Sequence, residues 1–172
     1  QGEYVLEAAG YAVIRDGVLQ GFTDQAAAFG ADLLRGMGKG QVLELSGPDQ
    51  GYTALKITGV KTTFRTVFEG ETIVGLRVAC ALETQAVELS GTAARLGEED
   101  RLALEEELSR LAGAAMEAAM DQFQSLRADA IHLLDRVALA VPWKQAAMEE
   151  QWWQAFPRLT LEVEVEATVA RS

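Results

Sequence analysis

The last part of the chain alternates strictly between apolar and polar side chains. From residue 159 to 168 every odd position is apolar and every even position is threonine or glutamate. Successive side chains of a strand point to opposite faces, so the pattern predicts a strand with one buried and one solvated face. Such a strand needs a covering layer on one side, which we expect to be helical. The apolar positions are Leu159, Leu161, Val163, Val165 and Ala167.

Two longer stretches, residues 52–68 and 71–89, are rich in Val, Ile, Leu and Thr and are separated by Glu69-Gly70. This composition predicts two long strands joined by a tight turn, that is, one long antiparallel hairpin. Gly59 and Gly75 lie inside these strands and indicate bulges or bends. We expect a shorter strand over 41–46 and an opening hairpin over 11–22 that turns at Asp16-Gly17.

A long helix is predicted over residues 98–127, because apolar side chains recur there at steps of three and four. Further helices are predicted over 24–37, with Thr23 as the N-cap, over 129–139 and over 143–155. The fold class is therefore α+β: an antiparallel sheet with a long hairpin, packed on one face by three to four helices. We expect residues 1–172 to form a single domain, with 1–9 as a linker or the start of the first strand.

The charge balance argues against nucleic-acid partners. Fifteen Lys and Arg against 26 Asp and Glu give a net charge of −11, which repels phosphate backbones and anionic lipid alike. The cations, Lys61 and Arg65 among them, are scattered along the sequence and suggest no basic patch. No apolar run approaches the ~18 residues that a membrane-spanning helix needs.

His132 is the only histidine, and Asp129 and Asp135 lie three residues to either side of it. On a helix these three side chains could form a metal-binding or catalytic site. We favour a histidine that packs or caps within a helical hairpin, and we expect no catalytic residue, no metal and no cofactor. The alternative is an extracytoplasmic domain or enzyme that binds a metal or a small molecule through these residues.

Other conspicuous side chains receive structural interpretations. Cys80 lies among apolar residues, which predicts an inert core thiol. Trp152 and Phe156 are four residues apart and should pack in the core, whereas Trp153 lies about 100° around the helix and is the better candidate for an exposed contact. Glu162, Glu164 and Glu166 share a solvated strand face, where Lys or Arg on the neighbouring strand would relieve their repulsion.

Several motifs resemble the C-terminal domain of the Ger(x)C family, the C subunits of bacterial spore germinant receptors. Near the end stand Ala128-Asp129, then Pro142-Trp143-Lys144, then Trp152-x-x-x-Phe156-Pro157, followed by the strand that alternates valine with glutamate. Residues 10–14 and 19–22 are similar to the opening hairpin of the family. The resemblance covers about residues 8–171.

The resemblance implies a non-enzymatic receptor domain that works through protein–protein contacts in germination signalling. The full-length protein would be a lipoprotein on the outer face of the spore inner membrane, held there only by its lipid anchor. Since the chain begins at Gln1, we expect it to be the C-terminal domain of that longer protein. Its partners would be the membrane-embedded receptor subunits and the preceding domains of its own chain. We expect the contact surface at Trp153, Glu162 and Glu164.

Overall fold

The structure is a computed structural model that describes residues 12–15, 18–22, 24–46, 52–89 and 96–170. Strands β1 and β2 form a two-stranded sheet, and the other four form one sheet in the order β3-β4-β5-β6. This architecture confirms the predicted α+β class. The expected linker 1–9 and the turn at Asp16-Gly17 lie outside the described residues. The elements in chain order are β1 Ala12–Arg15, β2 Val18–Phe22, α1 Gln25–Leu34, β3 Val42–Ser46, β4 Tyr52–Glu69, β5 Thr72–Leu89, α2 Glu98–Ser125, α3 Leu133–Ala140, η1 Pro142–Lys144, α4 Gln145–Ala155, η2 Phe156–Arg158 and β6 Thr160–Ala170, where η marks a 3-10 helix.

The long hairpin of β4 and β5 forms as predicted, with 18 residues in each strand. Its register shifts three times, once between Ile57 and Gly59 and once opposite Gly75. Little space is available at Gly75, because a Cβ at this position would lie 2.4 Å from Oγ1 and 3.1 Å from the carbonyl oxygen of Thr160. The two glycines therefore mark irregularities, as the sequence indicated.

Strand β6 differs from the expected antiparallel arrangement, because it pairs with β5 in parallel. The connection from β5 to β6 contains α2, α3, η1, α4 and η2, and it returns the chain to the end of the sheet where β5 begins. Such a crossover produces parallel strands, whereas a short turn produces antiparallel ones. The alternation of β6 is as predicted, with the threonines and glutamates exposed.

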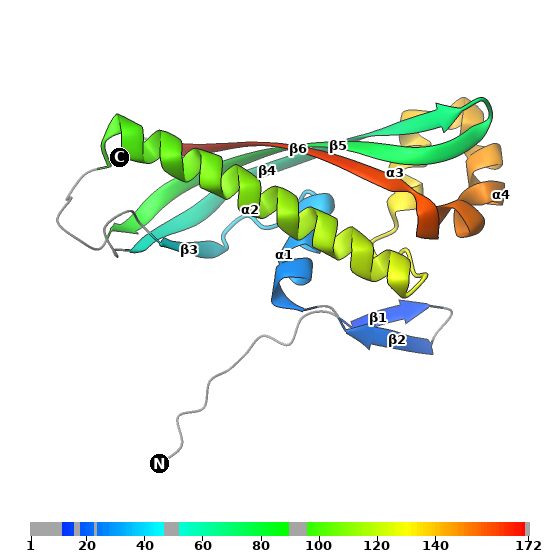
Figure 1. The fold of residues 1–172 in the computed structure, drawn as a ribbon, viewed down its shortest axis with the longest axis horizontal. Coiled ribbons are helices and arrows are strands. Elements are labelled where there is room, and N and C mark those ends of the chain that lie inside the picture. The colour runs from blue at the N-terminus through cyan, green and yellow to red at the C-terminus, as the bar shows by residue number, and fades with distance from the viewer. Residues whose placement is uncertain (1–11, 16–17, 23, 47–51, 90–95, 171–172) are drawn as a thin grey trace, which may run out of the picture.

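The core lies between one face of the sheet and the helices. Figure 1 shows α2 running lengthwise near β6, with α3 and α4 gathered beside the tip of the hairpin. Leu104, Leu108 and Phe123 of α2 are buried, as the stripe predicted. Helix α1 packs so tightly on α2 that a Cβ at Gly30 would lie 1.8 Å from the carbonyl oxygen of Ala115. The helices thus cover one face of β4, β5 and β6.

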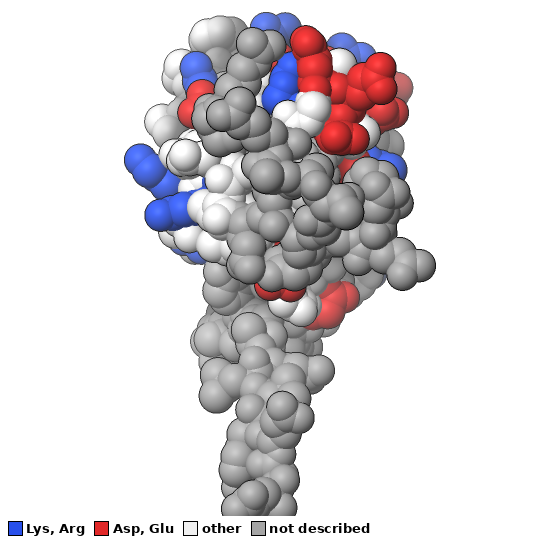
Figure 2. Space-filling view, turned by 90° about the vertical axis from the view of Figure 1, so that its left-hand side faces the viewer, with Lys and Arg blue, Asp and Glu red and all other residues white. Residues whose placement is uncertain are grey.

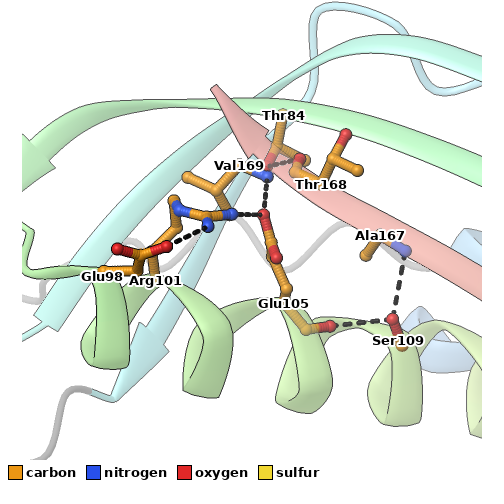
Figure 3. A network of polar contacts seen from close by, with 8 residues as sticks. All are labelled: Thr84, Glu98, Arg101, Glu105, Ser109, Ala167, Thr168 and Val169. Atoms are coloured by element: carbon orange, nitrogen blue, oxygen red, sulfur yellow. Dashed lines mark hydrogen bonds and ion pairs between the residues drawn. The ribbon is translucent and has the colours of Figure 1, made fainter. Parts of the chain in front are cut away.

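Helix α2 also covers the outer edge of β6 through polar contacts (Figure 3). The backbone N–H of Val169 donates to Oε1 of Glu105 at 2.9 Å, and that of Ala167 donates to Oγ of Ser109 at 3.1 Å. Arg101 pairs with the same Glu105 oxygen at 2.6 Å. These bonds satisfy strand N–H groups that would otherwise be free to pair with another chain.

Two helix starts differ from the sequence prediction. Asp24, not Thr23, caps α1 by accepting a bond from the N–H of Ala27, and Thr23 itself lies outside the described residues. Helix α3 begins at Leu133 rather than at 129, because His132 is left-handed with φ of 55°. The segment predicted over 143–155 is divided into η1 and α4. No helix in the described ranges is long and apolar enough to span a membrane.

Candidate functional site

Asp129 is mostly buried and links the start of α3 to α4. Its carboxylate accepts bonds from the N–H groups of Leu133 at 2.7 Å and Leu134 at 2.9 Å, and from Nε1 of Trp152 at 3.1 Å. Burial raises the pKa of this carboxyl, and the three donors act against that shift without cancelling it. Both oxygens are occupied by the protein itself, so Asp129 caps a helix and anchors an indole.

His132 and Asp135 do not converge with Asp129 on a common site. Their side chains are 81% and 79% exposed, and Nδ1 of His132 lies 3.8 Å from Oδ2 of Asp135. Across the ranges that the structure describes, no group of three or more His, Cys, Asp or Glu could hold a metal ion. The geometry therefore gives no support to the metal-binding or catalytic alternative at Asp129, His132 and Asp135.

Cys80 points into the core from β5, as the sequence predicted. It is 2% exposed, and burial raises the pKa of its thiol while a hydrogen bond with Thr62 acts in the opposite direction. A buried thiol with a raised pKa is a poor nucleophile. Cys80 thus contributes to packing.

The two adjacent tryptophans of α4 have opposite environments. Trp152 is fully buried and packs against Phe156, their ring centroids 5.5 Å apart and their planes tilted by 36°. Trp153 is 60% exposed, and Trp143 and Leu139 on the preceding segments are more exposed still. The end of the molecule that carries α3, η1 and α4 therefore presents large apolar side chains to solvent, and Trp153 stands among them as expected.

The face of the sheet turned away from the helices carries charges on all three long strands. Three rows of side chains run across β4, β5 and β6 in register. We call these nine side chains the outer sheet face. The rows are Arg65, Arg77 and Glu162; Thr63, Ala79 and Glu164; and Lys61, Ala81 and Glu166.

The charges of the outer sheet face are divided by strand, with cations on β4 and β5 and carboxylates on β6. Nε of Arg77 bonds Oε2 of Glu162 at 2.7 Å, which is the predicted relief of repulsion along the strand. Lys61 and Arg65, scattered in the sequence, lie two residues from the Thr63 row on the same strand face. Figure 2 views the molecule from one end, where acidic side chains gather at the upper right and basic side chains lie both next to them and on the opposite side.

The middle of the outer sheet face is hollowed because its central strand carries alanines there. A groove of about 530 Å³ lies between Arg65 and Glu162, and a second of about 320 Å³ lies between Lys61 and Glu166. Both grooves are lined by Thr63, Ala79 and Glu164, so they are continuous. The sequence identified the acidic side of this surface and predicted Lys or Arg on the neighbouring strand, but it did not identify which cations these are. The alternation at 61, 63 and 65 was the available signal for those on β4.

A separate groove of about 450 Å³ lies between the start of β5 and the end of α4. Its volume is that of a small-molecule site. Its polar groups, however, bond mainly to the protein: Gln151 contacts the backbone of Glu71 and Ile73, and Arg158 contacts the carbonyl of Gln154. The groove therefore offers few converging groups to a ligand, and Arg158 is its one charged side chain.

Comparison with known proteins gives one family and one fold. A family model described as "Spore germination B3/ GerAC like, C-terminal" matches residues 9–172. The fold is similar to that of a solved structure described as "Crystal Structure of the GerBC protein", with a TM-score of 0.76 and 16% sequence identity. The match covers 95% of this chain and 51% of that one, so this chain spans about half the length of the GerBC chain. No curated protein matches the sequence.

Proposed function

The chain belongs to the family of spore germination B3/GerAC-like C-terminal domains, and from this premise we propose that it is a non-enzymatic domain of a spore nutrient germinant receptor. It acts through contacts with other proteins in germination signalling. The observation that carries the proposal is the family match over residues 9–172. The similarity in fold to the GerBC protein supports it independently of sequence identity.

The chemistry of the described residues supports a binding role over a catalytic one. The conspicuous titratable side chains are engaged in the fold: Asp129 caps α3 and Cys80 packs in the core. His132 is exposed; Asp135 lies 3.8 Å from it, and the carboxylate of Asp129, which interacts with it electrostatically, is already engaged by backbone and indole N–H groups. A catalytic site needs a nucleophile, a base and an orienting group within bonding distance of one another, and these residues supply no such set.

The proposed contact surface consists of the outer sheet face, including Glu162 and Glu164, together with Trp153. Among the described residues nothing covers these side chains, and the outer sheet face carries unpaired charges of both signs beside a groove. Trp153 lies on α4, in the helical layer, and tryptophan is enriched among the residues that dominate binding energy at interfaces. The partners are the membrane-embedded subunits of the receptor and the preceding domains of its own chain.

The proposal includes the setting of the full-length protein. It is a lipoprotein on the outer face of the spore inner membrane, and this chain is its C-terminal domain. Its role is to help convert occupancy of the receptor by a germinant into commitment to germinate. The physical route is a shift in an equilibrium between receptor states, to which each subunit contact contributes a differential free energy.

Charge reversal on β6 tests the contact role. The double variant Glu162→Lys/Glu164→Lys should reduce co-purification of the full-length protein with the membrane-embedded subunits, because it inverts one side of the outer sheet face. Circular dichroism of the purified chain should be unchanged, since both side chains are exposed. The matched control is Glu106→Lys/Glu117→Lys, which changes net charge equally on the exposed side of α2. Unchanged co-purification of the β6 variant would contradict the proposal.

A further inference from the structure

The outer sheet face is electrically neutral on a strongly acidic chain. It holds three cations and three carboxylates, whereas the whole chain has a net charge of −11. Only Arg77 and Glu162 pair with each other; among the described residues the other four charges have no ion-pair partner. The six charges are Lys61, Arg65, Arg77, Glu162, Glu164 and Glu166.

We propose that the outer sheet face docks against the same face of a second copy of this chain, about a two-fold axis parallel to β5. This inference rests on the proposal that the face is a contact surface, and it names one occupant. Rotation of a copy by 180° about such an axis places its β6 over β4 of the first copy and its β4 over β6 of the first copy. Each row keeps its height along the strands during this rotation.

The register then brings opposite charges together across the axis. Lys61 and Glu166 share one row, so Lys61 meets Glu166 of the second copy. Arg65 and Glu162 share another row, so Arg65 meets Glu162 of the second copy. Because the axis is two-fold, each of these two contacts occurs twice in the dimer. A two-fold axis perpendicular to the strands would instead lay β4 over β4 and β6 over β6, and like charges would face each other at a cost in free energy.

The residues on the axis allow the two faces to approach. Ala79 and Ala81 lie at the centre and carry only methyl groups. The charged residues to either side of them on β5 lean away from the axis. Arg77 turns toward β6 to reach Glu162, and the carboxylate of Glu83 lies over β4, where a Cβ at Gly59 would be 2.7 Å from its Oε2. Packed sheets lie about 10 Å apart, which side chains of this size permit.

The dimer should be weak and sensitive to salt. The outer sheet face is a small surface, and stable interfaces usually bury about 800 Å² on each partner. Its attraction comes from exposed charges, which are screened at high ionic strength. Such an interface suits copies that are held close together on one surface, because a high local concentration favours weak contacts.

Sedimentation equilibrium of the purified chain tests the inference. The unaltered chain should self-associate at low ionic strength and dissociate at high ionic strength. Lys61→Glu alone and Glu166→Lys alone should each raise the Kd of self-association about tenfold or more, since each change places like charges together twice in every dimer. An equal mixture of the two variants should restore association, because every contact in the mixed dimer again joins opposite charges.

The control pair is Lys39→Glu and Glu117→Lys, which make the same charge changes at exposed positions outside the outer sheet face. These variants should associate as the unaltered chain does. A chain that remains monomeric at every ionic strength, or single variants that associate unchanged, would overturn the inference. A mixture that fails to recover would also overturn it. The co-purification test of the proposed function is decided separately, since a monomeric chain can still bind the receptor subunits.

Discussion

The indole Nε1 of Trp152 donates a hydrogen bond to the carboxylate of Asp129 at 3.1 Å, across 23 positions of sequence. The same carboxylate caps α3, so a single, mostly buried side chain contacts both the start of α3 and α4. Trp152 in turn packs against Phe156, just ahead of β6. This contact therefore holds together the helices that lead the chain into its last strand.

Replacement of Asp129 should destabilise the fold. Asp129→Asn leaves one oxygen to serve three N–H donors, and an unsatisfied buried donor costs about 1–3 kcal/mol in the free energy of unfolding. Urea unfolding followed by tryptophan fluorescence measures the loss. Asp135→Asn is the matched control, because Asp135 is exposed, and it should unfold as the unaltered chain does. Equal stability of the two variants would show that Asp129 does not link α3 to α4.

The stability that Asp129 contributes should depend on pH with a defined sign. Burial raises its pKa in the folded state, so the folded chain binds this proton more tightly than the unfolded chain does. The contribution is fully present below the unfolded pKa of about 3.9 and is reduced as pH rises through the raised folded value. The stability difference between the unaltered chain and Asp129→Asn should therefore shrink across this range and then stay constant. A difference that grows with pH would contradict the raised pKa.

Gly30 should tolerate no larger side chain. A Cβ there would lie 1.8 Å from the carbonyl oxygen of Ala115, so Gly30→Ala must push α1 away from α2. We expect a loss of about 2–3 kcal/mol in the free energy of unfolding, as for an overpacked core. Gly113→Ala on α2 is the control, since its Cβ would meet only a methyl of Val165 at 3.8 Å. That variant should be neutral or up to about 1 kcal/mol more stable, because alanine favours a helix. Thermal melts of both variants measure the contrast.

Cys80 should resist alkylation while the chain is folded. Its thiol is buried and its pKa is raised, so little thiolate is available to react. Mass spectrometry after treatment with iodoacetamide at neutral pH should show no modification in buffer and complete modification in strong denaturant. Rapid modification in buffer would mean that β5 opens to solvent and that the core beside it is not closed.

The sequence was sufficient for elements whose pattern is local. The alternation of β6 and the stripe of α2 each predict one element from neighbouring residues, and the turn predicted at Glu69-Gly70 lies one residue from its position at Gly70-Glu71. The parallel pairing of β6 was missed because nothing local specifies which strand a distant segment will join. The start of α3 was missed because two features set it that no local pattern shows: the left-handed backbone at His132 and the bonds from the N–H groups of Leu133 and Leu134 to Asp129.

The candidate surface was predicted in part for the same reason. Glu162 and Glu164 were found because they alternate within one strand, and Trp153 because of its position next to a core residue. The cations opposite them lie on strands about 85 to 105 positions earlier in the chain, and only the register of the folded sheet brings them onto one face. The basic side of the surface therefore depends on the tertiary structure and cannot be predicted from a local pattern.

The parallel pairing of β5 with β6 should limit the folding rate. Oγ1 of Thr160 bonds the carbonyl of Val74, which stands 86 positions earlier, so this pairing closes a very long loop. The β4–β5 hairpin can form outward from its own turn. The pairing of β6 with β5, in contrast, requires the intervening helices to fold and pack first. High contact order of this kind slows barrier crossing. Until β6 arrives, one side of β5 stays open, and a neighbouring chain can capture it by strand exchange.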